Sequence, residues 1–418
     1  MLSIDFILKN KQRVEESASK KGYKINVSKL IEIDDKRKQL IQKVQRLRAE
    51  LKKTSQKGIA ESLRELAKQK RGKIQQMEAS LAEVEAEWKN LLYEIPNLSA
   101  DDVKPGADAS ENEILRKYKD PTKFDFKPKD HLELGKELDI IDVERAAKIS
   151  GTRFGYIKNE AVALEFALVQ LAFQTLLKEK FQPVIPPVLI KKDITEGLGY
   201  WQAGGNEDYY LVREPGENLE FYLVGTAEHS LVPMHKDETF EKKDLPKRYV
   251  GFSTSFRREA GSYGRDTRGI FRVHQFDKVE MVSFTTDEND SKEHDYLLSL
   301  EEKLFQALDI PYQVVKMCTG DLGFPIARKY DIEAWIPSQN KYREVTSTST
   351  TTDFQARRLN IKYRDGEQKK YTHILNGTAF AVGRTIIAIL ENYQQKDGLV
   401  KIPKVLQPLT GFSEIRRK

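Results

Sequence analysis

Hydrophobic positions within residues 28–96 repeat at the spacing of two long helices. One run steps by three or four residues over 33–51, and a second does the same over 63–95. Such a stripe buries one face of each helix against a partner, as in coiled coils. A polar break at 53–58 separates the two runs. The pattern therefore predicts an antiparallel helical hairpin whose arms, at 1.5 Å per residue, are roughly 40–50 Å long.

Shorter segments lie on either side of this hairpin. Residues 3–20 predict a short helix that ends near Gly22, and Pro96 ends the second long helix because proline cannot continue the hydrogen-bond ladder. Residues 96–130 contain several prolines among many Asp, Lys and Ser residues. This composition predicts a connecting segment with little regular structure.

From residue 131 onward the chain mixes amphipathic helices with strand-like runs. The expected helices are near 131–138, 142–149, 160–179, 287–308 and 381–394. The expected strands are 153–157, 184–190, 249–255, 271–284, 312–316, 330–335 and 342–350. Because Pro186 and Pro187 interrupt one strand, we expect it at an edge or an interface. Strands mostly follow strands, which predicts an α+β fold: the helical hairpin, then an antiparallel sheet flanked by helices.

This organisation suggests three units. We expect an N-terminal domain at 1–97 that carries the hairpin at about 28–96, a linker at 98–130, and a sheet domain at 131–418. A chain of 418 residues is longer than one hydrophobic core usually supports, which agrees with a division into units.

Composition favours a water-soluble globular protein. The apolar fraction is 39% and the charged fraction 32%, and no run approaches the roughly 18 apolar residues of a membrane span. Asp5 and Lys9 interrupt the first apolar stretch, which argues against a signal peptide. The single cysteine, Cys318, forms no internal disulfide and no cysteine-based zinc site. We therefore expect a cytoplasmic protein without membrane association and without zinc.

Charge is concentrated on the distal hairpin. Residues 36–73 hold 14 basic and 3 acidic side chains, a net +11, whereas the whole chain is only +6. A solvated coiled-coil face or a scaffold arm is one interpretation, but such faces usually mix signs because like charges repel. A segregated basic tip favours a polyanion such as a nucleic acid. The candidate contact residues are Lys43, Arg46, Lys52, Lys53, Arg64, Lys68 and Arg71.

A charged pair of strands provides the first candidate for chemistry. The sequence SFRRE at 255–259 is followed by a loop rich in glycine and charge, and then by FRVHQFDKVE at 271–280. Strand alternation predicts that Arg257 and Glu259 lie on one face of the first strand, and that Arg272, His274 and Phe276 lie on one face of the second. Arginine binds phosphate oxygens through a bidentate fork, and an aromatic ring can stack on a base. The alternative is an exposed strand face with ion pairs.

Two weaker patterns follow. At 376–385 the small residues of NGTAFAVGRT allow a ligand to come close, and Arg384 lies in the first turn of the next helix. At 343–349 the carboxylate of Glu344 lies beside several hydroxyls, and Mg²⁺ prefers such oxygen ligands. Taken alone, each pattern is also ordinary for a helix start or a β-strand. The chain has neither a P-loop nor a dinucleotide-binding fingerprint, so a nucleotide site would need another architecture.

Together these blocks resemble the class II aminoacyl-tRNA synthetases. The second signature motif of that class is similar to FRRE followed by RVHQFDKVE, the third to AVGRTIIAILE, and the first, a dimer element, to the apolar helix before Pro186-Pro187. Within the class the resemblance is to seryl-tRNA synthetases. Their serine-binding TxE element is similar to Gly225-Thr226-Ala227-Glu228, and further family blocks resemble EAGSYGRDTRGIFRVHQF, TSTSTTTDFQARR and LNGTAFAVGRT. The chain departs from the family pattern at Thr350 and at Ala379-Phe380.

The resemblance implies a ligase that activates L-serine with ATP and Mg²⁺ and transfers it to the 3′ end of tRNA(Ser), and of tRNA(Sec) where present. It implies a homodimer whose basic hairpin contacts the tRNA. The catalytic residues it implies are Arg257, Glu344 and Arg384. The implied ATP-binding residues are Arg257, Arg258, Glu259, Arg272, Val273, Phe276, Glu344, Val345, Thr346, Ser347 and Arg384. The implied serine-binding residues are Thr226, Ala227, Glu228, Arg257, Glu280, Asn376 and Thr378, and the implied Mg²⁺ ligands are Glu344 and Ser347.

Two other functions stay open from the sequence. One is a class II relative that activates an amino acid for a carrier protein, against which the basic hairpin speaks. The other is a non-catalytic RNA-binding or scaffold protein, against which the presence of Arg257, Glu259, Glu344 and Arg384 speaks.

Overall fold

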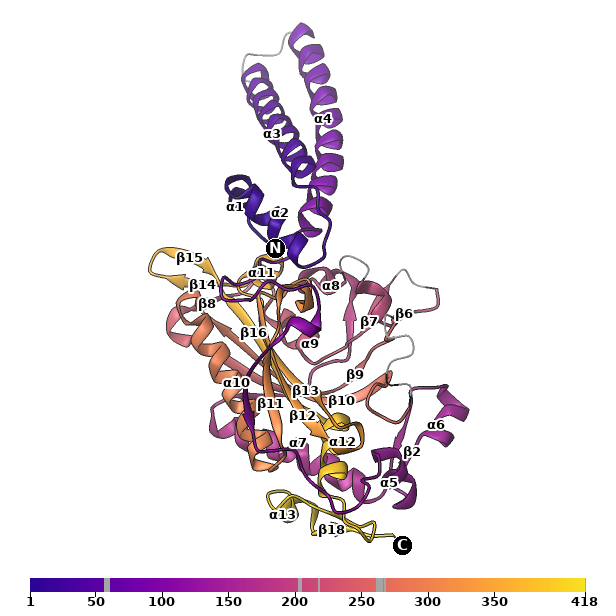
Figure 1. The fold of residues 1–418 in the computed structure, drawn as a ribbon. Coiled ribbons are helices and arrows are strands. Elements are labelled where there is room, and N and C mark those ends of the chain that lie inside the picture. Colours follow the sequence, from indigo (N-terminus) through magenta and orange to yellow (C-terminus); the bar gives the residue numbers. More distant parts are fainter. Residues whose placement is uncertain (56–60, 202–204, 217–218, 261–265, 267, 418) are drawn as a thin grey trace. The chain divides into compact units, whose positions relative to one another are not determined.

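The computed structural model describes residues 1–418 apart from 56–60, 202–204, 217–218, 261–265, 267 and 418. The chain divides into two compact units, Met1–Pro96 and Asn97–Lys418. Both units bury apolar side chains, such as Leu30 in the first and Phe380 in the second, and Figure 1 shows the ribbon of each.

The first unit is helical. It consists of α1 (Ile4–Lys9), α2 (Lys11–Lys20), α3 (Val27–Ser55) and α4 (Glu61–Tyr93). The single helix expected over 3–20 is wrong, because the backbone leaves helical geometry at Asn10, with φ −129° and ψ 35°. The Asn10 side-chain amide donates to the Phe6 carbonyl oxygen at 2.9 Å, which caps α1 and separates it from α2.

The predicted hairpin is confirmed, since α3 and α4 lie side by side (Figure 1). The buried positions of its stripe are Ile33, Val44, Ile74 and Val84. Near its base the Arg37 guanidinium lies 4.6 Å from the centre of the Trp88 ring. Helix α3 continues to Ser55, inside the predicted break, and residues 56–58 of that break lie outside the described residues.

The second unit is built on an eight-stranded sheet in the order β1-β11-β12-β13-β16-β10-β9-β4. The bounds are β1 (Glu113–Tyr118), β4 (Gln182–Val184), β9 (Lys247–Phe256), β10 (Gln275–Thr285), β11 (Tyr312–Lys316), β12 (Arg328–Ile336), β13 (Lys341–Thr350) and β16 (His373–Ala381). Neighbours pair antiparallel except β4 and β9, which are parallel. The predicted sheet is confirmed, with one parallel edge strand.

In and beside the eight-stranded sheet, three regions differ from the sequence prediction. Residues 96–130, expected to be irregular, supply edge strand β1, which pairs with β11 and is anchored by an Arg116–Glu302 ion pair at 2.5 Å. Central strand β16 was not expected, because its small residues look like a loop that leads into a helix. The run 184–190 is not one strand, since Pro186 and Pro187 divide it between β4 and β5 (Leu189–Lys191), which belong to different sheets.

Three long helices, α7 (Glu160–Lys178), α10 (Asp290–Ala307) and α12 (Val382–Tyr393), cover one face of this sheet. The shorter helices α5 (His131–Glu137) and α6 (Val143–Ser150) contact the small strands β2 (Ile141–Asp142) and β3 (Tyr156–Ile157) instead. Apolar side chains of α7, α10 and α12 share one core with Val279 and Met281 of β10. Because successive strand residues point to opposite faces, Lys278 and Glu280 must face away from that core. The side of the sheet opposite the helices is therefore available for a polar site.

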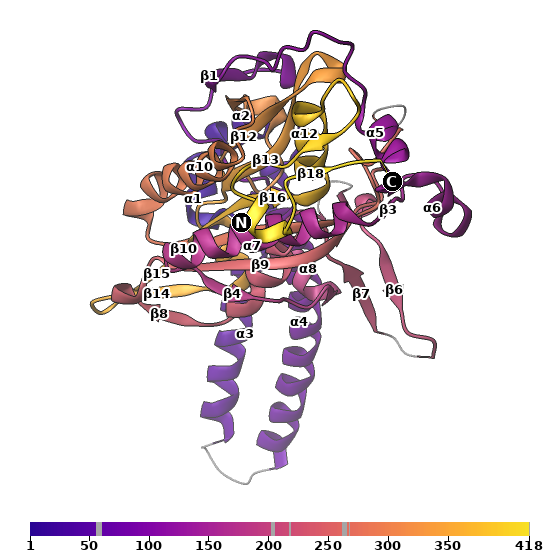
Figure 2. The ribbon, with the colours of Figure 1, turned by 90° about the horizontal axis from the view of Figure 1, so that it is seen from below.

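Helix α7 has one buried side and one exposed apolar side. It is long and apolar enough to cross a membrane by length and composition alone. One side of it lies in the core through Leu164, Leu168 and Leu176, and it contacts β4, β9 and β16 (Figure 2). Its other side exposes apolar side chains, among them Phe166, which is 62% exposed. Such a helix has the character of a core helix with a second apolar face.

Short elements complete the unit. The smaller sheets contain β2 (Ile141–Asp142), β3 (Tyr156–Ile157), β5, β6 (Leu211–Arg213), β7 (Glu220–Leu223), β8 (Thr239–Glu241), β14 (Lys362–Asp365), β15 (Gln368–Tyr371), β17 (Val400–Lys401) and β18 (Glu414–Ile415). The short helices are α8 (Lys192–Leu198), α9 (Glu228–Leu231), α11 (Phe354–Leu359) and α13 (Gln407–Thr410). Of these, α9 matters most for the site, because it begins at a predicted site residue.

Candidate active site

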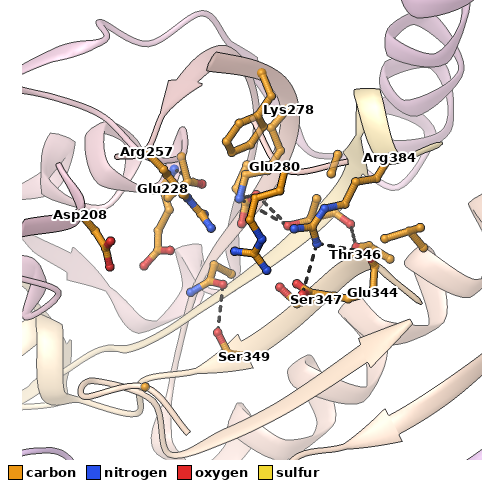
Figure 3. Close-up of a pocket in the computed structure, with 18 of the residues that line it drawn as sticks. Asp208, Glu228, Arg257, Lys278, Glu280, Glu344, Thr346, Ser347, Ser349 and Arg384 are labelled. Carbon is orange, nitrogen blue, oxygen red and sulfur yellow. Dashed lines mark hydrogen bonds and ion pairs between the residues drawn. The ribbon is translucent and has the colours of Figure 1, made fainter. Parts of the chain in front are cut away.

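A cavity of about 440 Å³ opens on the face of the sheet that the long helices leave uncovered (Figure 3). It is lined from β10, β12, β13 and β16, from the segment that follows β9, and from the starts of α9 and α12. The predicted site residues that line it are Thr226, Glu228, Arg257, Glu259, Arg272, Val273, Phe276, Glu280, Glu344, Val345, Thr346, Ser347, Asn376, Thr378 and Arg384. Segments more than a hundred residues apart in the sequence thus meet in one space.

A β-bulge in β13 determines which of its side chains enter the cavity. Against β12, Thr346 pairs with Ile332 but Glu344 pairs with Glu333, so Val345 is an extra residue. Without this bulge, side chains three residues apart would point to opposite faces. With it, the carboxylate of Glu344 and the hydroxyl of Ser347 lie on the same face, and both line the cavity.

A second bulge, in β16, determines the direction of the Thr378 side chain. Glu280 of β10 pairs with Thr378, whereas Val279 pairs with Phe380, which leaves Ala379 as the extra residue. Ala379 and Phe380, two of the three positions that depart from the family pattern, are fully buried at this bulge and lie outside the cavity lining. The bulge turns Thr378 toward Glu280, and its hydroxyl donates to Glu280 Oε2 at 3.1 Å.

One end of the cavity is rich in arginine. The guanidinium of Arg384 lies 3.2 Å from Glu344 Oε2 and donates to the Glu344 carbonyl oxygen at 3.1 Å. It also lies 4.8 Å from the centre of the Phe271 ring. Arg272 forms an ion pair with Glu259. Guanidinium groups beside an aromatic ring, open to a cavity, can bind phosphate oxygens and a planar base.

Electrostatics keep Glu344 ionised. Burial acts to raise the pKa of its carboxyl, but the positive charges of Arg384, Lys329 and Arg257 outweigh burial and lower that pKa to about 2. The Glu344 side chain is 43% exposed toward the cavity, so its oxygens are accessible. An ionised carboxylate beside the Ser347 hydroxyl supplies oxygen donors of the kind that Mg²⁺ takes together with water and substrate phosphates. Among the described residues no cluster of three His, Cys, Asp or Glu side chains is present, and a Mg²⁺ shared with phosphates does not need one.

Arg257 lies between the two ends of the cavity. Its Nε donates to the Gly225 carbonyl oxygen at 3.1 Å, and its guanidinium lies 5.5 Å from the centre of the Phe276 ring. Its backbone N–H donates to the His274 carbonyl oxygen at 3.0 Å. These contacts hold the side chain in one place while it lines the cavity.

The other end of the cavity is small and polar. Glu228, at the start of α9, accepts hydrogen bonds from the Tyr200 hydroxyl at 2.9 Å and from the Gln355 amide at 3.1 Å. Burial, and next the negative charge of Glu280, raise the pKa of Glu228 to about 7. Glu280 is 2.7 Å from the ammonium of Lys278. This end can bind a small ligand that carries an ammonium and a hydroxyl.

Three predicted residues do not line the cavity. Ala227 is fully buried beneath it, and Arg258 is exposed, with its backbone N–H donating to the Asp208 carbonyl oxygen at 2.7 Å. His274 was expected beside Phe276, but β10 begins only at Gln275, so strand alternation does not extend to it. Its Nδ1 instead lies 2.9 Å from the Arg257 carbonyl oxygen.

Other lining residues escaped the sequence prediction. They include Tyr200, Asp208, Tyr209, His229, Phe271, Lys278, Asp321 and Lys329. Lys278 could have been found, because it lies midway between Phe276 and Glu280 in the alternation of β10. Tyr200 and Asp321 come from separate segments, and only the fold brings them to the cavity.

A distant histidine anchors the segment that enters the cavity at Ile270. The Ile270 backbone N–H donates to His131 Nε2 at 3.3 Å, while His131 Nδ1 is 3.3 Å from the buried Glu391. Gly269 has φ +76°, and a Cβ there would meet His131 Nε2 at 2.0 Å. The close approach therefore requires glycine, and it fixes Ile270 and Phe271 at the cavity wall. Residues 261–265 and 267 of the preceding loop lie outside the described residues.

Comparisons with known proteins agree on one family. A model described as "tRNA synthetase class II core domain (G, H, P, S and T)" matches residues 210–393, and one described as "Seryl-tRNA synthetase N-terminal domain" matches residues 1–99. A serine–tRNA ligase from Dictyoglomus turgidum is 44% identical over the full length of both chains.

Solved structures give the same result. A seryl-tRNA synthetase from Pyrococcus horikoshii complexed with ATP superposes with a TM-score of 0.91 at 38% identity, covering 100% of both chains. A cytoplasmic serine–tRNA ligase from Naegleria fowleri in complex with AMP gives a TM-score of 0.86 at 32% identity, covering 98% of this chain and 96% of that one.

Proposed function

The chain belongs to the seryl-tRNA synthetase family. From that premise we propose which functions of a serine–tRNA ligase its cavity, its helical arm and one exposed helix face carry out. The enzyme joins serine to tRNA at the expense of ATP. The observation that carries the assignment to this cavity is that Arg257, Glu344 and Arg384, from three separate sequence motifs, line one space.

The chemistry needs no protein nucleophile. The serine carboxylate attacks the α-phosphorus of ATP, the bond to the β-phosphate oxygen breaks, and pyrophosphate leaves. A ribose hydroxyl of the terminal tRNA nucleotide then attacks the acyl carbon, and AMP leaves. Catalysis of such steps is mostly positioning and charge stabilisation at phosphorus. The protein must therefore hold two substrates in line and neutralise developing charge.

The arginine-rich end is proposed to bind ATP. Arg257, between the two ends, would hold the α-phosphate and the serine carboxylate, while Arg272 and Arg384 reach the terminal phosphate. Glu259 would accept from the adenine amino group, and Phe276 and Arg384 would enclose the adenine. Val273, Val345 and Thr346 also line this cavity. Arg258 is exposed and lies outside the cavity lining, so it would contact ATP from the rim.

Glu344 and Ser347 are proposed to hold Mg²⁺. Their support is the bulge that aligns them and the low pKa of Glu344. When bound, Mg²⁺ neutralises phosphate charge and orients the phosphates. Arg384 contacts the same carboxylate and so links the metal ligand to the nucleotide end.

The small polar end is proposed to bind serine through Thr226, Glu228, Glu280, Asn376 and Thr378, with Ala227 supplying backbone beneath. A pocket that hydrogen-bonds a hydroxyl rejects alanine, because alanine would leave buried polar groups unpaired. A larger side chain such as that of threonine is rejected by size.

The pH dependence of serine activation tests the role of Glu228. As pH falls through about 7 its carboxyl becomes protonated and can no longer pair with the serine ammonium. We expect kcat/KM for serine in ATP–pyrophosphate exchange to fall over that pH range. The variant Glu228→Gln should lower kcat/KM for serine by ~100-fold and lose this pH dependence, with the KM for ATP changed by less than ~3-fold. An unchanged pH profile in Glu228→Gln would remove Glu228 from the serine site.

The exposed face of α7 is proposed to form a homodimer interface. Phe166 and Leu177 on α7 and Ile185 just beyond it, 85% exposed, present apolar surface, and such surface in a folded protein usually marks an interface. Two copies related by a two-fold axis would bury the same face on each.

Light scattering tests the dimer. The double variant Phe166→Glu with Ile185→Glu should be monomeric at micromolar concentration, because burying two carboxylates at an apolar interface is costly. As a matched control, Ile114→Glu changes a 52% exposed isoleucine on β1, at the opposite edge of the sheet from β4, and should remain dimeric. A monomeric wild-type chain would contradict the proposal.

The helical arm is proposed to bind tRNA. Its candidate residues Lys43, Arg46, Lys52, Lys53, Arg64, Lys68 and Arg71 are all exposed. Within the described part of the arm, Arg46 pairs with Glu50 at 3.2 Å, and no ion pair engages the other six. Unneutralised positive charge on an exposed arm is the electrostatic signature of nucleic-acid binding.

The family assignment supports a soluble protein, and we propose the cytoplasm as its compartment.

A further inference from the structure

A buried lysine lies inside the proposed serine pocket. Lys278 is 7% exposed and lines the cavity between Phe276 and Glu280 on the same face of β10. Its ammonium is 2.7 Å from Glu280 Oε2 and 3.4 Å from the Thr378 hydroxyl oxygen. Lysine is almost never buried unless it is paired, so its presence among pocket residues calls for a role in the pocket (Figure 3).

The two carboxylate oxygens of Glu280 differ in their hydrogen bonds. Both the Lys278 ammonium and the Thr378 hydroxyl donate to Oε2. In the described part of the chain no hydrogen bond engages Oε1, although the side chain lines the cavity. Two donors on one oxygen fix the carboxylate in orientation and leave the other oxygen free to accept from a ligand hydroxyl.

The same lysine adds a positive charge close to two carboxylates at this end of the cavity. Two carboxylates, Glu228 and Glu280, share the space with two cations, Arg257 and Lys278. Burial, opposed by the charge of Glu280, lowers the pKa of Lys278, and the charge of Lys278 is among those that restrain the raised pKa of Glu228. Serine carries one positive and one negative charge, so its binding does not change the net charge at this end of the cavity.

We propose that Lys278 is a positioning residue for serine: by holding Glu280 through Oε2 it presents Oε1 to the serine hydroxyl, and its charge allows two carboxylates to share the pocket. This inference rests on the proposed assignment of serine to the polar end of the cavity. It adds a residue that acts on amino-acid selection through Glu280 and Thr378, and not by contact with the reacting atoms.

The test is ATP–pyrophosphate exchange by the variant Lys278→Met. Its KM for serine should rise by ~30-fold or more while its KM for ATP changes by less than ~3-fold. Its preference for serine over alanine should fall by at least ~10-fold, because the hydroxyl acceptor is no longer fixed. The fall of kcat/KM for serine with decreasing pH should move to higher pH than in the wild type, since Glu228 loses a neighbouring positive charge.

Matched variants separate this role from general damage. Lys329 also lines the cavity and pairs with Asp331 at 3.1 Å, but it lies near Glu344, so Lys329→Met should affect the KM for ATP and leave the preference for serine over alanine unchanged. If Lys278→Met does not fold, Lys278→Gln, which keeps a donor and removes the charge, should still show the pH shift and the rise in the KM for serine.

Equal changes in the KM values for serine and ATP, with the preference over alanine intact, would overturn the role of Lys278. That result differs from failure of the proposed function, in which the wild-type chain itself would show no serine-dependent exchange.

Discussion

Replacing Arg257 with alanine is expected to lower serine-dependent ATP–pyrophosphate exchange by ~10²–10³-fold, the usual effect of removing one preorganised group that stabilises transition-state charge. Arg257 lies where the arginine-rich end and the small polar end of the cavity meet, held by the Gly225 carbonyl oxygen and the Phe276 ring. The loss should appear in kcat more than in the KM for either substrate, because charge at phosphorus develops during the reaction.

A surface arginine provides the control. Arg364 is half exposed and pairs with Glu241 at 3.3 Å on a small peripheral sheet. Surface ion pairs contribute at most ~1 kcal/mol, so Arg364→Ala should exchange pyrophosphate like the wild type. An Arg257→Ala variant that matched this control would mean that the cavity has been assigned to the wrong chemistry.

Shortening the arm is expected to separate the two halves of the reaction. If residues 41–77 are replaced by a short glycine-rich turn, serine activation should stay near the wild-type level. Charging of tRNA should fall by at least ~100-fold, because phosphate contacts supply much of the affinity of a protein for nucleic acid. The base of the hairpin keeps the Arg37–Glu85 ion pair and the Arg37–Trp88 contact, which lie outside the deletion.

The charge of the arm can be tested without shortening it. Replacing Lys43, Arg46, Lys52 and Lys53 with glutamine should weaken tRNA binding and flatten its salt dependence, by ~3 units of log–log slope if all four contact phosphates. Glu83 and Glu87 are exposed on the same hairpin, and Glu83→Gln with Glu87→Gln should leave tRNA binding no weaker. Normal tRNA charging by the shortened chain would contradict tRNA binding by the hairpin and would favour a scaffold role for it.

Much of this fold follows from local sequence. The hairpin could be predicted because its apolar spacing extends over many turns, and strands such as β11 and β13 were recognisable from their β-branched and alternating residues. Strand β1 was not, since a six-residue edge strand between prolines has no signal apart from its partner β11. The interruption at Asn10 depends on one side-chain hydrogen bond, which helical periodicity does not encode.

Many of the residues that line the cavity were predicted, but its geometry was not. Alternation along an ideal strand would separate Glu344 from Ser347, and only the bulge at Val345 places both on one face. A bulge depends on the register with the neighbouring strand, so it cannot be read from one segment. The bulge of β16 at Ala379 was missed for the same reason, and with it the contact between Thr378 and Glu280, which Lys278 joins.

The most direct measurement of the central claim is ATP–pyrophosphate exchange by the purified wild-type chain with Mg-ATP and one amino acid at a time. Serine should support exchange at least ~100-fold better than alanine, since a pocket built for a hydroxyl leaves polar groups unpaired without it. Threonine should be a similarly poor substrate. Exchange that is absent with serine, or equal with another amino acid, would contradict the assignment of this cavity to serine activation.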